Sequence, residues 1–227
     1  VQSTALLLMS CKGVLPKLDC AIFADTGWEP EAVYKHLDWC VEEAARAGID
    51  VHIVKGTKKG IKEDVLDNIP NPDGGRVAGL PFFTTHEEGH RTGIAMRQCT
   101  SEYKIAPITK FIRRELLGLK PRQRAPKEVV MEMWMGISFD EAPRAKPSLD
   151  KWKTHVFPFL SWGCDYLEKK TWRRRDCINW LEENYPERVV PRSACIGCPF
   201  HDNSEWRKLS EEEFEDACKF DEAIRVD

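Results

Sequence analysis

The sequence predicts an α/β fold in which a parallel sheet is flanked by helices, followed by a C-terminal helical segment that contains cysteines. An apolar stretch, an amphipathic helix and a second apolar stretch follow one another over residues 19–54. A helix of this length between two strands makes the strands parallel. Polar residues follow predicted strands at Asp25 and at Asp140, which is where sheets of this class bind ligands.

The chain opens with a helical pattern. Residues 2–9 predict a helix, with Ser3 or Thr4 as its N-cap. No strand pattern comes before this helix. We therefore expect the full protein to have further residues ahead of Val1.

A strand, a helix and a second strand come next. The apolar run at residues 19–24 predicts a buried strand, and residues 49–54 predict the second. Between them, Pro30 and the spacing of apolar side chains predict a helix over residues 31–47, which Gly48 ends.

The remaining elements follow from the same patterns. Residues 69–93 are rich in Gly, Pro, Asn and Asp and predict a long loop, in which His86, Glu87 and His90 form either a metal site or a polar lid. Residues 145–170 have no regular pattern. Predicted helices cover residues 56–68, 107–117, 174–185 and 205–225, and a predicted strand covers residues 129–137.

Length and composition describe a soluble protein of one large domain, or of one domain with a small appendage. The chain has 227 residues, 42% of them hydrophobic and 31% charged, with a net charge of −3. The apolar run Ala5–Met9 is too short to span a bilayer. Nine cysteines without an export signal predict a cytoplasmic protein that uses thiols for metal binding or catalysis.

A pair of cysteines near the C-terminal end forms the most specific motif. Cys195 and Cys198 enclose Gly197, and Pro199 follows directly. Glycine allows a tight turn and proline prevents a helix or strand from continuing, so both sulfurs face one point. Such a turn suits a metal or an iron–sulfur cluster. The alternative is a pair of buried structural cysteines or a disulfide.

Basic residues are clustered although the chain is acidic overall. Such clusters contact phosphates of tRNA or DNA, or they form the solvated face of a helix or loop. The arginines concerned are Arg113, Arg114, Arg122, Arg124, Arg173, Arg174 and Arg175.

Four segments over residues 1–144 resemble the adenine nucleotide alpha-hydrolase superfamily, in its phosphoadenylyl-sulfate (PAPS) reductase-like branch. Val1–Thr4 looks like the end of the Ser-Gly-Gly-x-x-Ser-Thr pyrophosphate loop, and Asp25-Thr26-Gly27 with Glu31 looks like the second nucleotide-binding segment. Residues 97–107 resemble the cysteine–lysine–proline element, and residues 136–144 the later anion-binding strand end. The last third is matched mainly by the cysteine pair.

The resemblance implies a Rossmann-like nucleotide-binding domain over residues 1–144, without its first strand and part of the pyrophosphate loop. Residues 145–227 would form a cysteine-containing extension packed on it. It also implies attack at the alpha-phosphate of ATP or use of a sulfonucleotide, with a magnesium ion and sulfur transfer or reduction. The implied catalytic residues are Asp25, Lys104 and Arg144; the implied nucleotide-binding residues are Gln2, Ser3, Thr4, Asp25, Thr26, Gly27, Glu31, Arg97, Gly136, Asp140 and Glu141.

A [4Fe–4S] cluster is expected on four cysteines. The expected ligands are Cys99, Cys177, Cys195 and Cys198, with Cys164 as the substitute for Cys177. The adenylyl-sulfate reductases' cysteine pair is absent because Gln98 precedes Cys99, and the C-terminal Glu-Cys-Gly segment is missing. The chain is therefore closer to the cluster-bearing members, which include the reductase-like enzymes of DNA phosphorothioation.

Four thiolates also suit zinc. The alternative function is therefore a zinc-stapled module that binds nucleotide or nucleic acid without turnover. The remaining cysteines, at positions 11, 20, 40 and 218, are expected to be core thiols.

Overall fold

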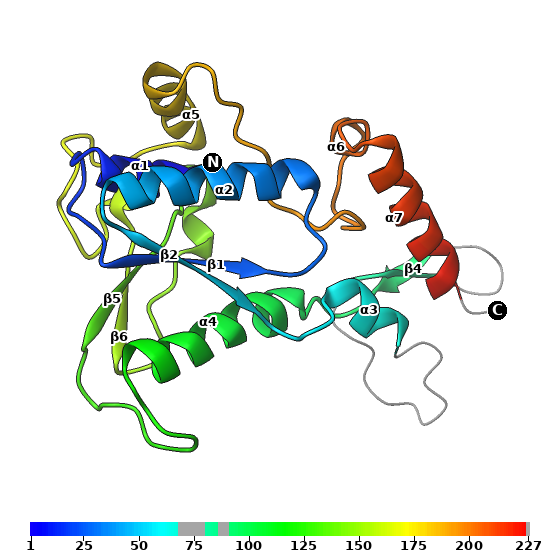
Figure 1. The fold of residues 1–227 in the computed structure, drawn as a ribbon, viewed down its shortest axis with the longest axis horizontal. Helices are drawn as coiled ribbons and strands as arrows, with labels where there is room; N and C mark the ends of the chain where they lie inside the picture. Colours follow the sequence, from blue (N-terminus) through cyan, green and yellow to red (C-terminus); the bar gives the residue numbers. More distant parts are fainter. Residues whose placement is uncertain (68–79, 86–90, 226–227) are drawn as a thin grey trace. The chain divides into compact units, whose positions relative to one another are not determined.

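A computed structural model describes residues 1–67, 80–85 and 91–225 (Figure 1). The chain divides into two compact units, and each has its own hydrophobic cluster. The first unit comprises Val1–Ala21, Lys35–His52 and Arg113–Arg192. The second unit comprises Ile22–Tyr34, Ile53–Ile112 and Ser193–Asp227.

Four elements contribute residues to both units. They are β1 (Cys20–Asp25), α2 (Glu31–Arg46), β2 (Asp50–Lys55) and η2 (Ile112–Leu116). β1 and β2 are hydrogen-bonded neighbours in a parallel pair. Gly48 closes the turn after α2 with φ +67°, a conformation that glycine adopts without strain. The strand–helix–strand pattern read from the sequence is confirmed.

The first unit holds a second parallel pair. β5 (Met131–Trp134) lies beside β6 (Lys153–Val156), with Met131 opposite Lys153 and Trp134 opposite Val156 (Figure 1). Its helices are α1 (Gln2–Cys11), η2 (Ile112–Leu116), η3 (Phe139–Arg144), η4 (Pro158–Leu160) and α5 (Arg174–Asn184). The helix at residues 2–9 is confirmed, but its N-cap is Val1 rather than Ser3 or Thr4.

The second unit is mainly helical. Its helices are α3 (Ile61–Leu66), η1 (Thr100–Ile105), α4 (Ala106–Phe111), α6 (Asn203–Trp206) and α7 (Glu211–Ile224). The predicted helix at Pro107 begins earlier, at Thr100. The turn before this proline is π-helical. Pro107 has no N–H to donate to the α-helical ladder.

One strand pair and one further strand correct the sequence prediction. β3 (Phe83–Thr85) pairs antiparallel with β4 (Arg91–Ile94), inside the segment predicted as a loop. β6 lies in the segment predicted as irregular, because its four residues are too short to show alternation. His86, Glu87 and His90 lie outside the described residues.

The described residues form an α/β protein with parallel strand pairs and flanking helices, as the sequence predicts. Each of the three sheets among them has two strands. A larger Rossmann-like sheet and the division at residue 144 stay predictions.

The core of the first unit explains the apolar start of the chain. Ala5, Leu8 and Met9 of α1 are fully buried, together with Phe159 and Cys177. α1 is therefore a helix buried on nearly every side, which is why Ala5–Met9 lacks amphipathic spacing.

The core of the second unit is organised around Trp28. Its ring lies 4.5 Å from that of Phe220 of α7, measured between centroids. The indole N–H donates to Asp216 Oδ2 at 2.7 Å, and Lys62 of α3 pairs with the same carboxylate. This tryptophan thus connects the loop after β1 with α3 and α7.

We predict that Gly136→Ala destabilises the first unit. A Cβ at this position would lie 2.7 Å from the backbone nitrogen of Ser3 and 2.9 Å from the carbonyl carbon of Gln2. Because these are backbone atoms in a buried helix, relief requires a shift of α1, at a cost of about 1–3 kcal/mol. Thermal unfolding measures the loss. Gly118→Ala is the comparison, since nothing lies within 4 Å of a Cβ at that position. Only the backbone strain of its positive φ is expected there. An equal loss of stability in both variants would contradict the prediction.

Candidate functional site

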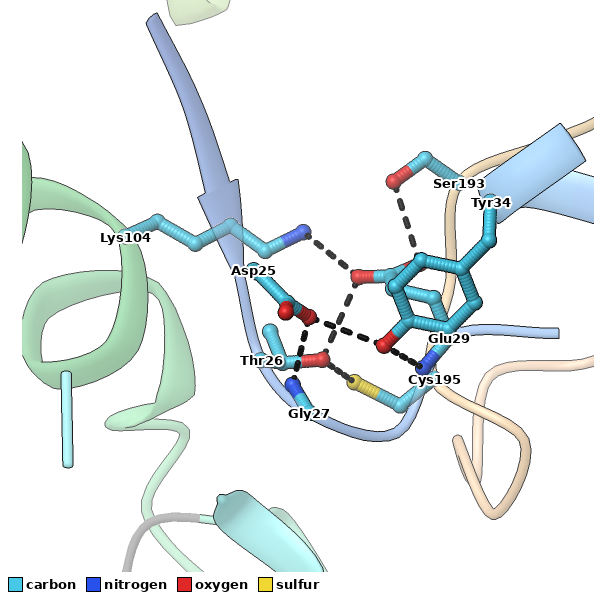
Figure 2. Close-up of polar contacts among 8 residues, drawn as sticks. All are labelled: Asp25, Thr26, Gly27, Glu29, Tyr34, Lys104, Ser193 and Cys195. Carbon is cyan, nitrogen blue, oxygen red and sulfur yellow. Dashed lines mark hydrogen bonds and ion pairs between the residues drawn. The ribbon is translucent and has the colours of Figure 1, made fainter. Parts of the chain in front are cut away.

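Asp25 ends β1 and holds the turn that follows it. Its Oδ1 accepts hydrogen bonds from Gly27 N–H at 2.7 Å and from the Tyr34 hydroxyl at 2.8 Å. Gly27 has φ +76°, a left-handed conformation that favours glycine. The sequence Asp25-Thr26-Gly27 therefore folds into a compact turn fixed by its own carboxylate (Figure 2).

A lysine from the neighbouring strand faces the same carboxylate. Lys55, the last residue of β2, places its Nζ 3.0 Å from Asp25 Oδ2. Only 6% of the Asp25 side chain is exposed, whereas 56% of the Lys55 side chain is exposed. The ammonium group therefore retains donors for a ligand at the strand end.

These contacts determine the protonation of Asp25. Burial alone would raise the pKa of Asp25, but hydrogen bonds from Gly27, Lys55 and Tyr34 outweigh it and hold the pKa below its usual value. Burial and the hydrogen bond to Asp25 raise the pKa of Tyr34. At neutral pH the pair is a carboxylate that accepts from a neutral phenol.

A second buried carboxylate lies beside this turn (Figure 2). Glu29 Oε1 accepts a hydrogen bond from the Thr26 hydroxyl at 3.3 Å, and Lys104 Nζ lies 3.8 Å from the same oxygen. Glu29 Oε2 accepts from the Ser193 hydroxyl at 3.2 Å. Burial raises the pKa of Glu29, although Lys104 and the hydroxyls oppose this shift.

The cysteine turn lies directly against the residues after β1. Ile196 N–H donates to the Trp28 carbonyl at 2.8 Å, and Cys198 N–H donates to the Cys195 carbonyl at 3.0 Å. A Cβ on Gly197 would lie 2.1 Å from the Trp28 indole, so only glycine allows this approach. The tight turn predicted from Gly197 and Pro199 is confirmed.

The sulfur of Cys195 contacts the predicted nucleotide segment. Cys195 Sγ lies 3.2 Å from Thr26 Oγ1, and both residues are buried. Burial and the charge of Glu29 raise the pKa of Cys195 to about 12. Cys195 is therefore a protonated thiol at neutral pH unless a metal or another cation displaces the proton.

Cys99 and Arg97 belong to the same unit. Cys99 precedes η1 and packs against the hydrophobic cluster that contains Cys195. The Arg97 guanidinium lies over the Phe200 ring, 5.5 Å from its centroid, just after the cysteine turn.

Cys177 lies in the apolar core of the first unit. It is fully buried on α5, and burial raises its pKa to about 12. In the part of the chain that the structure describes, no three His, Cys, Asp or Glu side chains are grouped as metal ligands. The set of four cysteine ligands stays a prediction.

The other cysteines differ from one another. Cys40 is buried in the core of the first unit, as predicted, and burial raises its pKa to about 12. Cys11 is half-buried and packs against that core. Cys20 and Cys164 are half-buried. Cys218 is exposed on α7, so the prediction of a core thiol there is wrong; the apolar face of α7 is formed by Ala217 and Phe220 instead.

The start of α1 forms a second polar cluster, in the first unit. The Gln2 amide N–H groups donate to Ser138 Oγ at 3.2 Å and to Glu141 Oε2 at 3.0 Å, and its carbonyl accepts from Arg174 Nη1 at 3.3 Å. Gln2 is 6% exposed. Gln2 and Glu141, which come from the first and the last of the predicted nucleotide-binding segments, are therefore in direct contact.

Neighbouring predicted residues complete this cluster. Asp140 Oδ2 accepts from the backbone N–H of Arg174 at 2.5 Å, and Arg144 pairs with Glu141 on the exposed helix η3. The Thr4 hydroxyl lies 3.1 Å from His36 Nε2, with Gly136 packed against Ser3. Glu31 is not part of this cluster: it lies in the second unit, where its backbone N–H donates to Glu213 Oε1 at 2.8 Å.

The clustered arginines all lie in the first unit. Arg113 and Arg114 donate to the carbonyls of Gln123 and Leu119, closing the loop after η2. Arg173, Arg174 and Arg175 occupy the start of α5, with Arg173 over the Phe139 ring. Arg122 has φ +64° in the loop that also holds Arg124.

Comparison with protein-family models, curated proteins and solved structures gives no match for this chain. In the described residues, no helix has both the length and the apolar character needed to cross a bilayer.

Four residues of the site are absent from the sequence prediction. Lys55 could have been found, because it ends a predicted strand as Asp25 does. Tyr34, Glu29 and Ser193 carry no such signal, since their roles depend on contacts outside their own short segments. Tyr34 reaches Asp25 from nine residues away, whereas Ser193 and Glu29 are 164 residues apart.

We predict that Asp25→Asn destabilises the protein by about 1–3 kcal/mol at pH 7, because hydrogen bonds to a charged acceptor are lost. The folded pKa of Asp25 lies below its usual value, so its contribution is fully present above the pKa of the unfolded chain and disappears as pH falls through the folded pKa. Urea unfolding of both proteins from pH 7 to pH 3 measures this difference. A difference that stays constant over the range would contradict the assignment.

Proposed function

We propose that this chain is an ATP-binding, PAPS reductase-like enzyme. It attacks the alpha-phosphate to adenylate an acceptor, and couples this to sulfur transfer or reduction. The observation that carries the proposal is the 3.2 Å contact between Thr26 Oγ1 and Cys195 Sγ. It brings a thiol to the strand end where α/β proteins bind ligands.

The charges of the second unit suit this chemistry. Lys55 and Lys104 are cations at the strand end, with side chains 56% and 36% exposed. In the proposed first step an acceptor oxygen bonds to the alpha-phosphorus and the bond to pyrophosphate breaks. Lysine ammonium groups neutralise the leaving pyrophosphate. A sulfur nucleophile then displaces AMP from the adenylated acceptor. Asp25 keeps the turn and Lys55 in place.

The first unit offers a second set of phosphate ligands. Gln2 and Arg144 stay predicted phosphate contacts in this proposal. Mg²⁺ would enter with the phosphates of ATP.

The cysteines of the second unit suit an iron–sulfur cluster in their chemistry. Cys195 and Cys198 lie in one tight turn. Cys99 packs against the hydrophobic cluster that contains Cys195. These three residues of the second unit are the proposed ligands. When bound, a cluster would supply electrons or a sulfur-binding iron.

The arginines at the start of α5 support an anionic acceptor such as tRNA or DNA. Arg174 and Arg175 occupy the first turn, where the helix dipole disfavours positive charge. A polyanion would offset that cost. The loop arginines Arg122 and Arg124 can also contact phosphates. We therefore include tRNA or DNA as the proposed acceptor.

We expect the protein to bind ATP and Lys55→Ala to weaken binding about tenfold, since one charge-assisted contact to phosphate is lost. Isothermal titration calorimetry with MgATP measures this. Lys219→Ala is the matched control, because Lys219 is also an exposed lysine of the second unit, 68% exposed and paired with Glu215. Equal affinity of the Lys55 variant and the wild type would exclude the strand end as the phosphate site.

Metal content distinguishes the enzyme from a zinc-stapled module. Protein purified without oxygen is expected to contain about four irons and four acid-labile sulfides per chain, and Cys195→Ala to lose them. Cys218→Ala should keep them, because this thiol is exposed and is not among the proposed ligands. One zinc without sulfide would instead support the binding module.

A further inference from the structure

Glu29 is a buried carboxylate that links three separate segments (Figure 2). Its side chain is 0% exposed. It accepts from Thr26 at the end of β1 and from Ser193 before the cysteine turn, and it pairs with Lys104 of η1. Glu29 has no part in the nucleotide binding or the chemical steps proposed above.

Burying a carboxylate between three segments costs desolvation free energy. An apolar side chain would avoid the desolvation penalty, and removal of one partner from a buried pair leaves an unsatisfied charge. Both carboxylate oxygens of Glu29 are nevertheless used, Oε1 by Thr26 and Lys104, and Oε2 by Ser193. The arrangement makes the positions of the three partners depend on one another.

The Thr26 hydroxyl extends this dependence to the sulfur. It lies within hydrogen-bond distance of both Glu29 Oε1 (3.3 Å) and Cys195 Sγ (3.2 Å). The backbone bond from Ile196 to Trp28 fixes the turn at the same place. A ligand that moves Thr26 or attracts Lys104 therefore changes contacts of the cysteine turn.

We infer that Glu29 is a positioning residue through which nucleotide binding at the strand end orders the cysteine turn. The inference rests on the proposed function, since it takes Thr26 and Lys104 to be nucleotide-binding residues. In its simplest form, ATP bound at the strand end holds Thr26 and Lys104, and Glu29 transmits this constraint to Ser193. The ordering then reaches Cys195 and Cys198 without direct contact between nucleotide and sulfur.

Amide hydrogen exchange of the protein as purified tests this inference, with and without MgATP. The reporter is the peptide that covers residues 193–198, because opening of the turn exposes its amides. In the wild type, ATP should slow exchange of this peptide. In Glu29→Ala, exchange without ATP should rise about tenfold and the effect of ATP should disappear. The α5 peptide, residues 174–184, is the internal reference for folding.

Two further variants separate positioning from general stability. Glu29→Gln keeps one oxygen that accepts from one hydroxyl and gains an amide N–H that can donate to the oxygen of the other, but it loses the charge opposite Lys104. It should therefore restore slow exchange without ATP and show a reduced ATP effect. Ser193→Ala removes the bond to Glu29 Oε2 and should free the turn. Because coupling between two sites is reciprocal, any loss of ATP affinity should be no larger than the factor by which ATP slows exchange in the wild type. Glu215→Ala, which removes an exposed carboxylate on α7, should match the wild type. Ser193→Ala also serves if Glu29→Ala does not fold.

Three results would overturn the inference: exchange of residues 193–198 unchanged in Glu29→Ala and Ser193→Ala, no rescue by Glu29→Gln, or a wild type that binds ATP without slower exchange. A wild type that binds no ATP would contradict the proposed function instead. The comparison of variants without ATP then decides whether Glu29 holds the turn.

Discussion

The approach of the cysteine turn to Trp28 is the constraint on which the candidate site depends. Because Gly197 has no side chain, its backbone packs on the indole, where a Cβ would lie 2.1 Å from the ring. This contact allows Ile196 N–H to reach the Trp28 carbonyl at 2.8 Å. The same geometry brings Cys195 to Thr26. Hydrophobic packing around one tryptophan therefore positions a polar cluster.

Two carboxylates close to this turn have opposite electrostatic environments. Asp25 accepts from a backbone amide, a phenol and a lysine, so its pKa is lowered. Glu29 is more deeply buried, and desolvation raises its pKa in spite of Lys104. Pairs of acids with pKa values displaced in opposite directions are common at functional sites, because each group can then perform a different task. Asp25 is suited to hold a cation and Glu29 to hold hydroxyl groups.

The sequence predicts local elements well and long-range pairings poorly. Periodicity and glycine placement identify β1, α2 and β2, and the strand-end rule identifies Asp25 because it depends only on neighbouring residues. The Glu29–Ser193 contact spans 164 residues, and Glu29 itself precedes Pro30 in a stretch that looks like an ordinary helix start. β6 is too short for alternation to appear, and α7 buries Ala217 and Phe220 rather than Cys218.

Burial alone does not separate a functional thiol from a structural one. Cys177 and Cys195 are both buried, and burial raises the pKa of each to about 12. They differ in their neighbours: Cys177 packs among apolar side chains of α1 and α5, whereas Cys195 contacts the Thr26 hydroxyl and shares a cluster with Glu29 and Lys104. Polar groups are expensive to bury and are kept only where they are satisfied or used. This difference, more than the spacing of the cysteines, is the reason to look for the chemistry at the end of β1.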